Sequence, residues 1–269
     1  MNSHYRTFFG FTAEPFAADL AQNDILVTEA VTQVQSRFDY AVRLGAIGLV
    51  TGEIGSGKST ALRFASASLH PSEYQVFYVT GSSGSILELY RQILDALGIC
   101  KTSSSRAILT ALIKKEITEL VEGKKLKTVL IIDEASLLRL EVFAELHTIC
   151  QFHKDSKHYL PVILAGQANL IDKLMYRASA PLASRVVARS HLEGLERQGM
   201  RQYIEHHLKL CGIKTQLFED PALTAIHQGS GGLLRKANHL ARGALIAAAA
   251  SQSMRVNAEH VRLAATEIF

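Results

Sequence analysis

A glycine-rich segment near residue 55 constrains this chain more than any other feature. The pattern G-x-x-x-x-G-K-[ST] is matched in full by Gly52-Glu53-Ile54-Gly55-Ser56-Gly57-Lys58-Ser59. An apolar run, residues 46–50, predicts a buried strand before it, and apolar spacing at Leu62, Ala65 and Leu69 predicts a helix after it. Between a strand and a helix, glycines let backbone N–H groups point inward, and the helix N-terminus adds partial positive charge. The segment therefore predicts a phosphate-binding loop.

The side chains of this loop predict a nucleotide and a metal ion. Lys58 is expected to reach the β- and γ-phosphates, and the Ser59 hydroxyl is expected to ligate Mg²⁺. We therefore expect ATP and Mg²⁺ as cofactors. The expected nucleotide-binding residues of the loop are Gly52, Glu53, Ile54, Gly55, Ser56, Gly57, Lys58, Ser59 and Thr60.

A second motif joins an apolar run, residues 129–132, to two acids, Asp133 and Glu134. An isolated acidic pair after a strand is often a solvated turn. In a chain with a phosphate-binding loop, however, Asp133 is expected to hold Mg²⁺ and Glu134 to polarise the attacking water. Because a glutamate in this place suits attack by water, we expect ATP hydrolysis rather than phosphoryl transfer to a metabolite.

Strands and helices alternate over the first two thirds of the chain. Further strands are predicted at residues 75–80, 128–133, 161–165 and 186–188, with helical apolar spacing between them. This alternation favours an α/β fold with a parallel sheet covered by helices on both faces. From about residue 194 only helices are predicted. We expect an α/β nucleotide-binding core with an aromatic N-terminal segment over residues 1–193, and a small all-α domain over residues 194–269.

Composition sets broader limits on the chain. Its 269 residues are 48% hydrophobic with a formal net charge of +4, which excludes a disordered chain and permits a polyanionic partner without requiring one. The three cysteines lie far apart, and the eleven histidines lack metal-ligand spacing, so neither a disulfide framework nor a zinc site is predicted. No run approaches the roughly 20 apolar residues of a membrane span, so we expect a cytoplasmic protein without direct membrane insertion.

Together, these motifs resemble the AAA+ ATPases, in which a P-loop NTPase core with a parallel five-stranded sheet is followed by a helical lid. The whole chain resembles the ExeA (GspA) group and the related transposition ATPases of the TnsC, TniB and MuB kind. The residues that carry this resemblance are Phe9-Gly10-Phe11, Pro15-Phe16, residues 52–59, 132–135 and 165–170, Tyr203-Ile204 to Leu208, Leu217-Phe218, Ala222, Ile226 and residues 231–238. Leu233-Leu234 and Lys236-Ala237 depart from the group's usual residues around the sensor-2 arginine.

The resemblance also implies polar residues around the γ-phosphate. Gln167 is similar to the sensor-1 residue, and Arg235 is similar to the sensor-2 residue that couples the lid to the γ-phosphate. A cation is disfavoured at a helix N-terminus, and this misfit supports a functional role for Arg235. Arg185 resembles the arginine finger that reaches a neighbouring subunit, with Arg189 as the competing choice. The expected catalytic residues are Glu134, Lys58, Arg185, Gln167 and Arg235.

The partners implied by the resemblance are further copies of the chain, in a ring or helical filament, and double-stranded DNA. In DNA-binding relatives, residues between the second and third strands contact phosphates. This makes Lys101, Thr102, Ser103 and Arg106 the DNA-binding candidates, with a solvated helix face as the alternative. Such contacts would carry no sequence information.

The leading hypothesis from the sequence is an ATPase, stimulated by oligomerisation and DNA, that assembles with ATP on DNA. It would serve a transposase as a transposition helper that selects the target. The mild basicity and the end of the chain shortly after the last lid helix favour this hypothesis. The alternative is a cytoplasmic ExeA-type ATPase module that serves secretion or envelope assembly through a membrane partner. A nucleotide-gated scaffold that scarcely hydrolyses ATP is a third hypothesis.

Overall fold

The computed structural model describes residues 4–100 and 103–267. These residues form two compact units. The α/β unit comprises Thr28–Gly52 and Lys58–Leu192. The helical unit comprises the described residues up to Val27, Glu53–Gly57, and the described residues from Glu193 onward.

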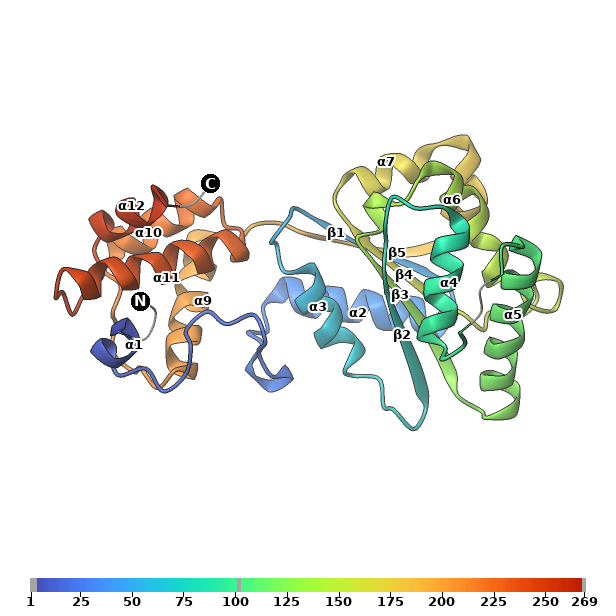
Figure 1. Cartoon of the computed structure of the whole chain (residues 1–269), viewed down its shortest axis with the longest axis horizontal. Coiled ribbons are helices and arrows are strands. Elements are labelled where there is room, and N and C mark those ends of the chain that lie inside the picture. Colours follow the sequence, from blue (N-terminus) through green and yellow to red (C-terminus); the bar gives the residue numbers. More distant parts are fainter. Residues whose placement is uncertain (1–3, 101–102, 268–269) are drawn as a thin grey trace. The chain divides into compact units, whose positions relative to one another are not determined.

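The α/β unit is built on a five-stranded sheet whose paired strands are all parallel (Figure 1). The strands are β1 (Ile47–Gly52), β2 (Tyr74–Thr80), β3 (Lys127–Asp133), β4 (Val162–Gly166) and β5 (Val186–Leu192). Their order is β2-β3-β4-β1-β5, so β4 lies between the strand that enters the phosphate-binding loop and the strand that ends in Asp133. The predicted parallel five-stranded α/β fold is confirmed. Strand β5 extends beyond the predicted 186–188 because polar residues alternate with buried ones on this edge strand.

Helices cover both faces of the sheet. The helices of this unit are α2 (Glu29–Leu44), α3 (Lys58–Ser66), α4 (Ile86–Ala96), α5 (Arg106–Thr118), α6 (Leu140–Leu146), α7 (Asn169–Met175) and α8 (Ala180–Ala183). Helices α2 and α3 pack with Val129 and Ile131 on one face, whereas α4, α5 and α6 pack with Leu130 and Ile132 on the other. Strand β3 is therefore buried on both sides, which explains its uninterrupted apolar run.

The helical unit consists of α1 (His4–Phe9), α9 (Arg197–Leu210), α10 (Asp220–Ser230), α11 (Leu234–Ala250) and α12 (Ala258–Ala265). Its core is one apolar cluster in which small residues of α11 allow close helix packing. Among the described residues, no helix is both long and apolar enough to cross a membrane.

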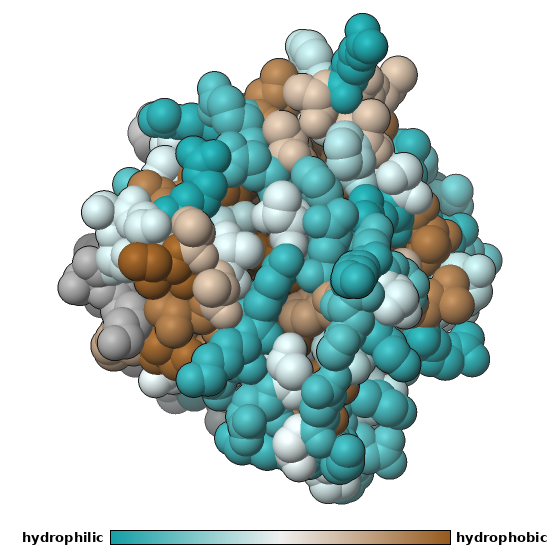
Figure 2. Space-filling model, turned by 90° about the vertical axis from the view of Figure 1, so that its right-hand side faces the viewer, coloured by the Kyte–Doolittle hydropathy of each residue, from teal (hydrophilic) through white to brown (hydrophobic). Residues whose placement is uncertain are grey.

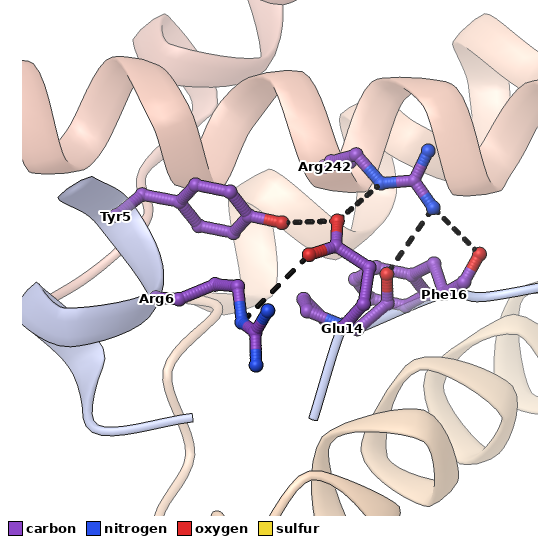
Figure 3. Close-up of polar contacts among 6 residues, drawn as sticks. Tyr5, Arg6, Glu14, Phe16 and Arg242 are labelled. Carbon is purple, nitrogen blue, oxygen red and sulfur yellow. Dashed lines mark hydrogen bonds and ion pairs between the residues drawn. The ribbon is translucent and has the colours of Figure 1, made fainter. Parts of the chain in front are cut away.

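The N-terminal aromatic segment packs in the helical unit and not in the α/β core to which the sequence-based domain boundaries assigned it. The side chains of Tyr5, Phe9, Phe11 and Phe16 are buried in the apolar cluster of the helical unit. A guanidinium N–H of Arg242 on α11 donates to the carbonyl oxygen of Phe16 at 2.8 Å (Figure 3). The assignment of this segment by chain order alone is therefore wrong, because its large aromatic side chains are buried by contact with α9 and α11.

A carboxylate fastens this segment to the helical unit. The Tyr5 hydroxyl donates to Glu14 Oε1 at 2.5 Å, and Arg242 Nε lies 3.3 Å from the same oxygen (Figure 3). Arg6 Nε lies 3.8 Å from Glu14 Oε2. One carboxylate thus connects α1, the loop after it and α11. Burial and the hydrogen bond to Glu14 raise the pKa of Tyr5, which keeps this hydroxyl a donor at neutral pH.

A buried histidine makes the stability of the helical unit depend on pH. His207 on α9 is only 2% exposed and lies against the rings of Phe16 and Tyr203, and burial, together with the neighbouring His206, lowers its pKa to about 4. Between pH 6.5 and pH 4, the unfolded chain binds a proton at His207 that the native state does not. The free energy of unfolding therefore falls as the pH falls through this window.

We expect His207 to reduce the free energy of unfolding by about 2 kcal/mol between pH 7 and pH 4.5. Urea unfolding of wild type and His207→Phe at both pH values measures this contribution, because the phenyl ring cannot take up the proton. The variant should lose less stability on acidification than wild type. His239→Phe, at an exposed position of α11, is the matched control. Equal losses in wild type and His207→Phe would contradict the expectation.

Candidate nucleotide-binding and hydrolysis site

The loop after β1 has the conformation that phosphate binding requires. Gly55 and Gly57 have φ values of +83° and +97°, which side-chain-bearing residues rarely adopt. The Ser56 hydroxyl is buried without a hydrogen-bond partner in the described part of the chain. Lys58 is buried, and its ammonium donates to the carbonyl oxygen of Gly52 at 3.0 Å. A buried, unsatisfied hydroxyl and a buried cation beside glycine backbone fit a polyanionic ligand.

The remaining predicted residues of the loop differ in exposure. Glu53 and Ile54 are exposed, whereas Thr60 is half-buried in the first turn of α3. The Ser59 residue next to it is exposed, so its hydroxyl is accessible to a ligand. Most of the predicted phosphate-binding segment is thus backbone and short side chains.

The two sequence motifs meet at one carboxylate. The Ser59 hydroxyl donates to Asp133 Oδ2 at 2.7 Å, across 74 positions in sequence. The other carboxylate oxygen, Oδ1, accepts the backbone N–H of Glu134 at 2.8 Å. The strands β1 and β3 run in the same direction, so their carboxyl ends lie at the same edge of the sheet. A hydroxyl beside a carboxylate is a donor set that suits Mg²⁺, which keeps several waters and phosphate oxygens as its other ligands.

Glu134 stands at the start of the turn that follows β3. Its backbone is left-handed, with φ 51° and ψ 30°, a conformation that costs a side-chain-bearing residue about 1 kcal/mol. Within residues 4–100 and 103–267, its carboxylate has no hydrogen-bond or ion-pair partner. An acid that is held beside the predicted metal-binding residues without a partner is free to accept a proton from water.

A lysine that the sequence analysis did not select holds the turn after Glu134. The ammonium of Lys173 on α7 donates to the carbonyl oxygens of Ser136 and Leu138, at 2.7 and 2.6 Å. Ser136 lies within the short helix η3 (Ala135–Leu137), and Leu138 follows it directly. Lys173 therefore ties α7 to the turn that carries Glu134. The sequence gives no local signal for this contact, because 35 to 37 positions separate the partners.

Gln167 follows β4 at the same edge of the sheet. Since β4 lies between β1 and β3, this residue is placed between the phosphate-binding loop and the two acids. It is half-buried, and its side-chain amide has no hydrogen-bond partner in the part of the chain that the structure describes. Its role as the sensor-1 residue stays a prediction.

Arg185 lies at the opposite end of the parallel strands, where their amino ends meet. It precedes β5, and its carbonyl oxygen accepts the N–H of Ile47, the first residue of β1. Strand β1 has six residues, so its carboxyl end, from which the phosphate-binding loop continues, lies roughly 17–20 Å along the strand from Ile47. The Arg185 guanidinium pairs with Asp155 at 2.6 Å and donates to the carbonyl oxygen of Pro181 at 2.6 Å. Arg185 is therefore remote from the carboxyl end of β1 in its own α/β unit.

The competing residue, Arg189, lies within β5, opposite Leu49 of β1. Its side chain is exposed on the edge strand. Unlike Arg185, it has no hydrogen-bond or ion-pair partner within the described ranges. Arg189 lies in the outermost strand β5 and Arg185 directly precedes it, so a second molecule can approach both arginines.

Arg235 is the second residue of α11, in the helical unit. Its side chain is exposed, and its backbone N–H donates to the carbonyl oxygen of Gly55 at 3.2 Å within that unit. The N-terminal position on the helix agrees with the sequence analysis. Its role as the sensor-2 residue stays a prediction.

The four DNA-binding candidates precede or begin α5. Lys101 and Thr102 lie outside the described residues. The carbonyl oxygen of Ser103 accepts two N–H groups of Arg91, at 3.3 and 3.0 Å. Arg106 pairs with Glu145 at 2.6 Å, so its charge is compensated within the unit. Figure 2 looks onto the side of the α/β unit that carries α5 and shows a mainly hydrophilic face with apolar patches.

Tyr78 on β2 is a further site residue that the sequence analysis did not select. Its hydroxyl donates to Asp133 Oδ2, the oxygen that also accepts the Ser59 hydroxyl. Burial and the hydrogen bond to Asp133 raise the pKa of Tyr78, so it is a protonated donor at neutral pH. The alignment of β2 with β3 in the sheet brings Tyr78 to Asp133, and the local sequence of either strand gives no signal for this contact.

Known proteins share parts of this sequence and fold. Residues 42–174 match a family model described as an AAA domain. This part of the chain is similar to AAA domains. The match spans β1, the phosphate-binding loop, both acids, β4 and Gln167.

Nearly the whole chain is similar to a protein that is named for a secretion pathway. Over 267 residues the chain is 30% identical to the general secretion pathway protein A of Aeromonas hydrophila, an alignment that covers 98% of this chain and 48% of that protein. The chain thus spans about half the length of this curated relative.

Solved structures confirm the fold. Cdc6p of Pyrobaculum aerophilum superposes with a TM-score of 0.75 and 15% identity, covering 94% of this chain and 70% of that chain. The Aeropyrum pernix ORC1 protein in complex with DNA gives a TM-score of 0.69 and 16% identity, over 94% and 68% of the two chains. The Thermotoga maritima RuvB branch migration motor gives 0.55 and 20%, over 90% and 70%.

Proposed function

We propose that this chain is a Mg²⁺-dependent ATPase that hydrolyses ATP to ADP and phosphate and works as a homo-oligomer. One observation carries the proposal: the hydroxyl of Ser59, at the end of the phosphate-binding loop, donates to Asp133 beside the unpartnered Glu134. The similarity to AAA domains supports the same activity. Because it consumes ATP, we expect the chain to act in the cytoplasm.

Each residue has a defined task in this proposal. The backbone of residues 52–59 and Lys58 bind the phosphates, and Ser59 with Asp133 holds Mg²⁺. When bound, Mg²⁺ neutralises phosphate charge and orients the γ-phosphate. Glu134 accepts a proton from the attacking water, and Gln167 orients that water.

Arg185 completes the proposed site from a neighbouring subunit. Its place at the amino end of β5 is far from the carboxyl end of β1, from which the phosphate-binding loop continues, so a contribution to catalysis requires a second copy of the chain. A guanidinium beside the γ-phosphate stabilises the charge of the transition state. In this arrangement, the ion pair with Asp155 has to open before Arg185 reaches the neighbouring site.

Glu134→Gln should keep ATP binding and lower the steady-state rate of hydrolysis about 100-fold or more, because the amide cannot accept the proton. Phosphate release with saturating ATP measures the rate, and a fluorescent ATP analogue measures binding. Lys58→Ala is the contrasting variant and should lose binding as well. Equal turnover by wild type and Glu134→Gln would instead favour the nucleotide-gated scaffold.

Mixing two inactive variants should restore hydrolysis if Arg185 acts on a neighbouring subunit. Arg185→Ala should bind ATP with at least about 1,000-fold slower hydrolysis, the range typical of arginine fingers. Glu134→Gln subunits retain Arg185 and can supply it to the intact Glu134 of Arg185→Ala subunits. ATPase assays of the separate and mixed variants measure the recovery.

Two controls accompany the mixing experiment. Asp155→Ala removes the ion-pair partner and keeps Arg185, so it should retain hydrolysis. Arg189→Ala tests the competing arginine in the same assay. Recovery with Arg189→Ala and none with Arg185→Ala would transfer the role to Arg189, and no recovery with either would refute a finger supplied by a neighbouring subunit.

Two biological roles are considered for the proposed ATPase activity. The identity to general secretion pathway protein A favours an ExeA-type module that serves secretion or envelope assembly through a membrane partner. Assembly on double-stranded DNA as a helper of a transposase is supported by the net charge of +4 and by the fold shared with ORC1, which was solved in complex with DNA. The first role rests on sequence identity over nearly the whole chain and is the better supported one.

Duplex DNA distinguishes the two roles. If the chain assembles on DNA, ATP and duplex DNA at low salt should raise both the sedimentation coefficient and the ATPase rate, and Arg106→Ala should weaken the effect several-fold with a smaller salt dependence. Arg262→Ala, at another surface arginine paired with a glutamate at 2.6 Å, is the matched control. No response to DNA would leave the secretion-type module as the proposed role.

A further inference from the structure

Tyr78 lies beside the proposed metal site and has no role in the proposed hydrolysis mechanism. In the pairing of β2 with β3, Tyr78 lies opposite Ile131, and Thr80 lies opposite Asp133. Side chains two positions apart on a strand share a face, so Tyr78 and Asp133 lie on the same face of the sheet. The phenol reaches along this face to Asp133, and its hydroxyl donates to Oδ2.

The hydrogen bonds of Asp133 fix its carboxylate from three directions. Oδ2 accepts the hydroxyls of Ser59 and Tyr78, and Oδ1 accepts the N–H of Glu134. A carboxylate offers about four lone-pair positions, two on each oxygen. Three are therefore occupied, and the fourth, on Oδ1, is left for a metal ion or for a water bound to it.

The hydroxyl of Tyr78 is not required to satisfy a buried group. The residue is 48% exposed, so water could hydrate the phenol if it turned away from Asp133. Asp133 itself is only 6% exposed, and its orientation depends on the groups that surround it. The contact thus serves the carboxylate more than the phenol.

We propose that Tyr78 is a positioning residue. Its hydroxyl holds the Asp133 carboxylate in the orientation that binds Mg²⁺. This inference rests on the proposed ATPase function. Groups that hydrogen-bond to metal-binding side chains orient them, and their loss typically weakens metal binding about 10- to 100-fold. Ser59 and the backbone of Glu134 provide two of the three contacts to Asp133, and Tyr78 provides the third.

Tyr78→Phe tests the proposal, because it removes the hydroxyl and keeps the ring. Binding of a slowly hydrolysed fluorescent ATP analogue is measured over a series of Mg²⁺ concentrations and in EDTA. The variant should need about 10-fold more Mg²⁺ for half-maximal binding. Its binding in EDTA should equal that of wild type, a result that general damage to the α/β unit would not produce.

Tyr74→Phe is the matched control on the same strand. Its hydroxyl accepts the ammonium of Lys127 at 3.4 Å at the other end of β2, remote from Asp133. We expect the Mg²⁺ dependence of this variant to match that of wild type. Circular dichroism shows whether each variant is folded.

The remaining outcomes separate this inference from the proposed function. An unchanged Mg²⁺ dependence in Tyr78→Phe would overturn the inference and leave the ATPase proposal intact. Tighter Mg²⁺ binding would also overturn it, because the hydroxyl would then compete with the metal. If wild type bound no nucleotide at any Mg²⁺ concentration, the proposed function and this inference would both fail.

Discussion

The hydrogen bond from Ser59 to Asp133 is the contact on which the proposed site depends. It joins the loop that follows β1 to the end of β3, although these strands are separated in the sheet by β4. The contact forms because parallel strands end at a common edge, where a helix N-terminus and a strand-terminal acid face one another. The neighbouring groups are arranged around this carboxylate: Glu134 follows it in the chain, and Tyr78 reaches it from β2.

The two edges of the sheet divide the proposed chemistry. The carboxyl edge carries the phosphate-binding loop, both acids and Gln167, whereas Arg185 lies at the amino edge. A side chain cannot span the length of β1, so the residues of one α/β unit do not complete an arginine-assisted site. This separation gives a physical reason for the proposed self-assembly, because a second copy can bring the amino ends of its strands to the carboxyl ends of the first.

The helical unit shows how the chain termini contribute to one core. The aromatic residues of the N-terminal segment are buried among α9, α10 and α11, and Glu14 fixes the segment through Tyr5 and Arg242. The first and last parts of the chain are therefore stabilised together. His207, whose pKa is lowered by burial, lies in the same core. Its protonation is therefore expected to weaken the packing between this segment and α9.

Local sequence was sufficient for the parts of this protein whose physics is local. The loop pattern of residues 52–59, the apolar run before Asp133 and the alternation of strands with helices predicted the α/β fold and its phosphate-binding residues, because glycine content, hydrophobicity and residue spacing determine these features directly. Tertiary structure decided the rest. The contacts of Tyr78 with Asp133, Lys173 with the turn after Glu134, and Arg185 with Asp155 join residues 30 to 55 positions apart. The N-terminal aromatics likewise found their partners more than 180 residues away. Such contacts depend on strand order and helix packing, which bring distant side chains together. The sequence around each partner therefore contains no pattern that predicts them.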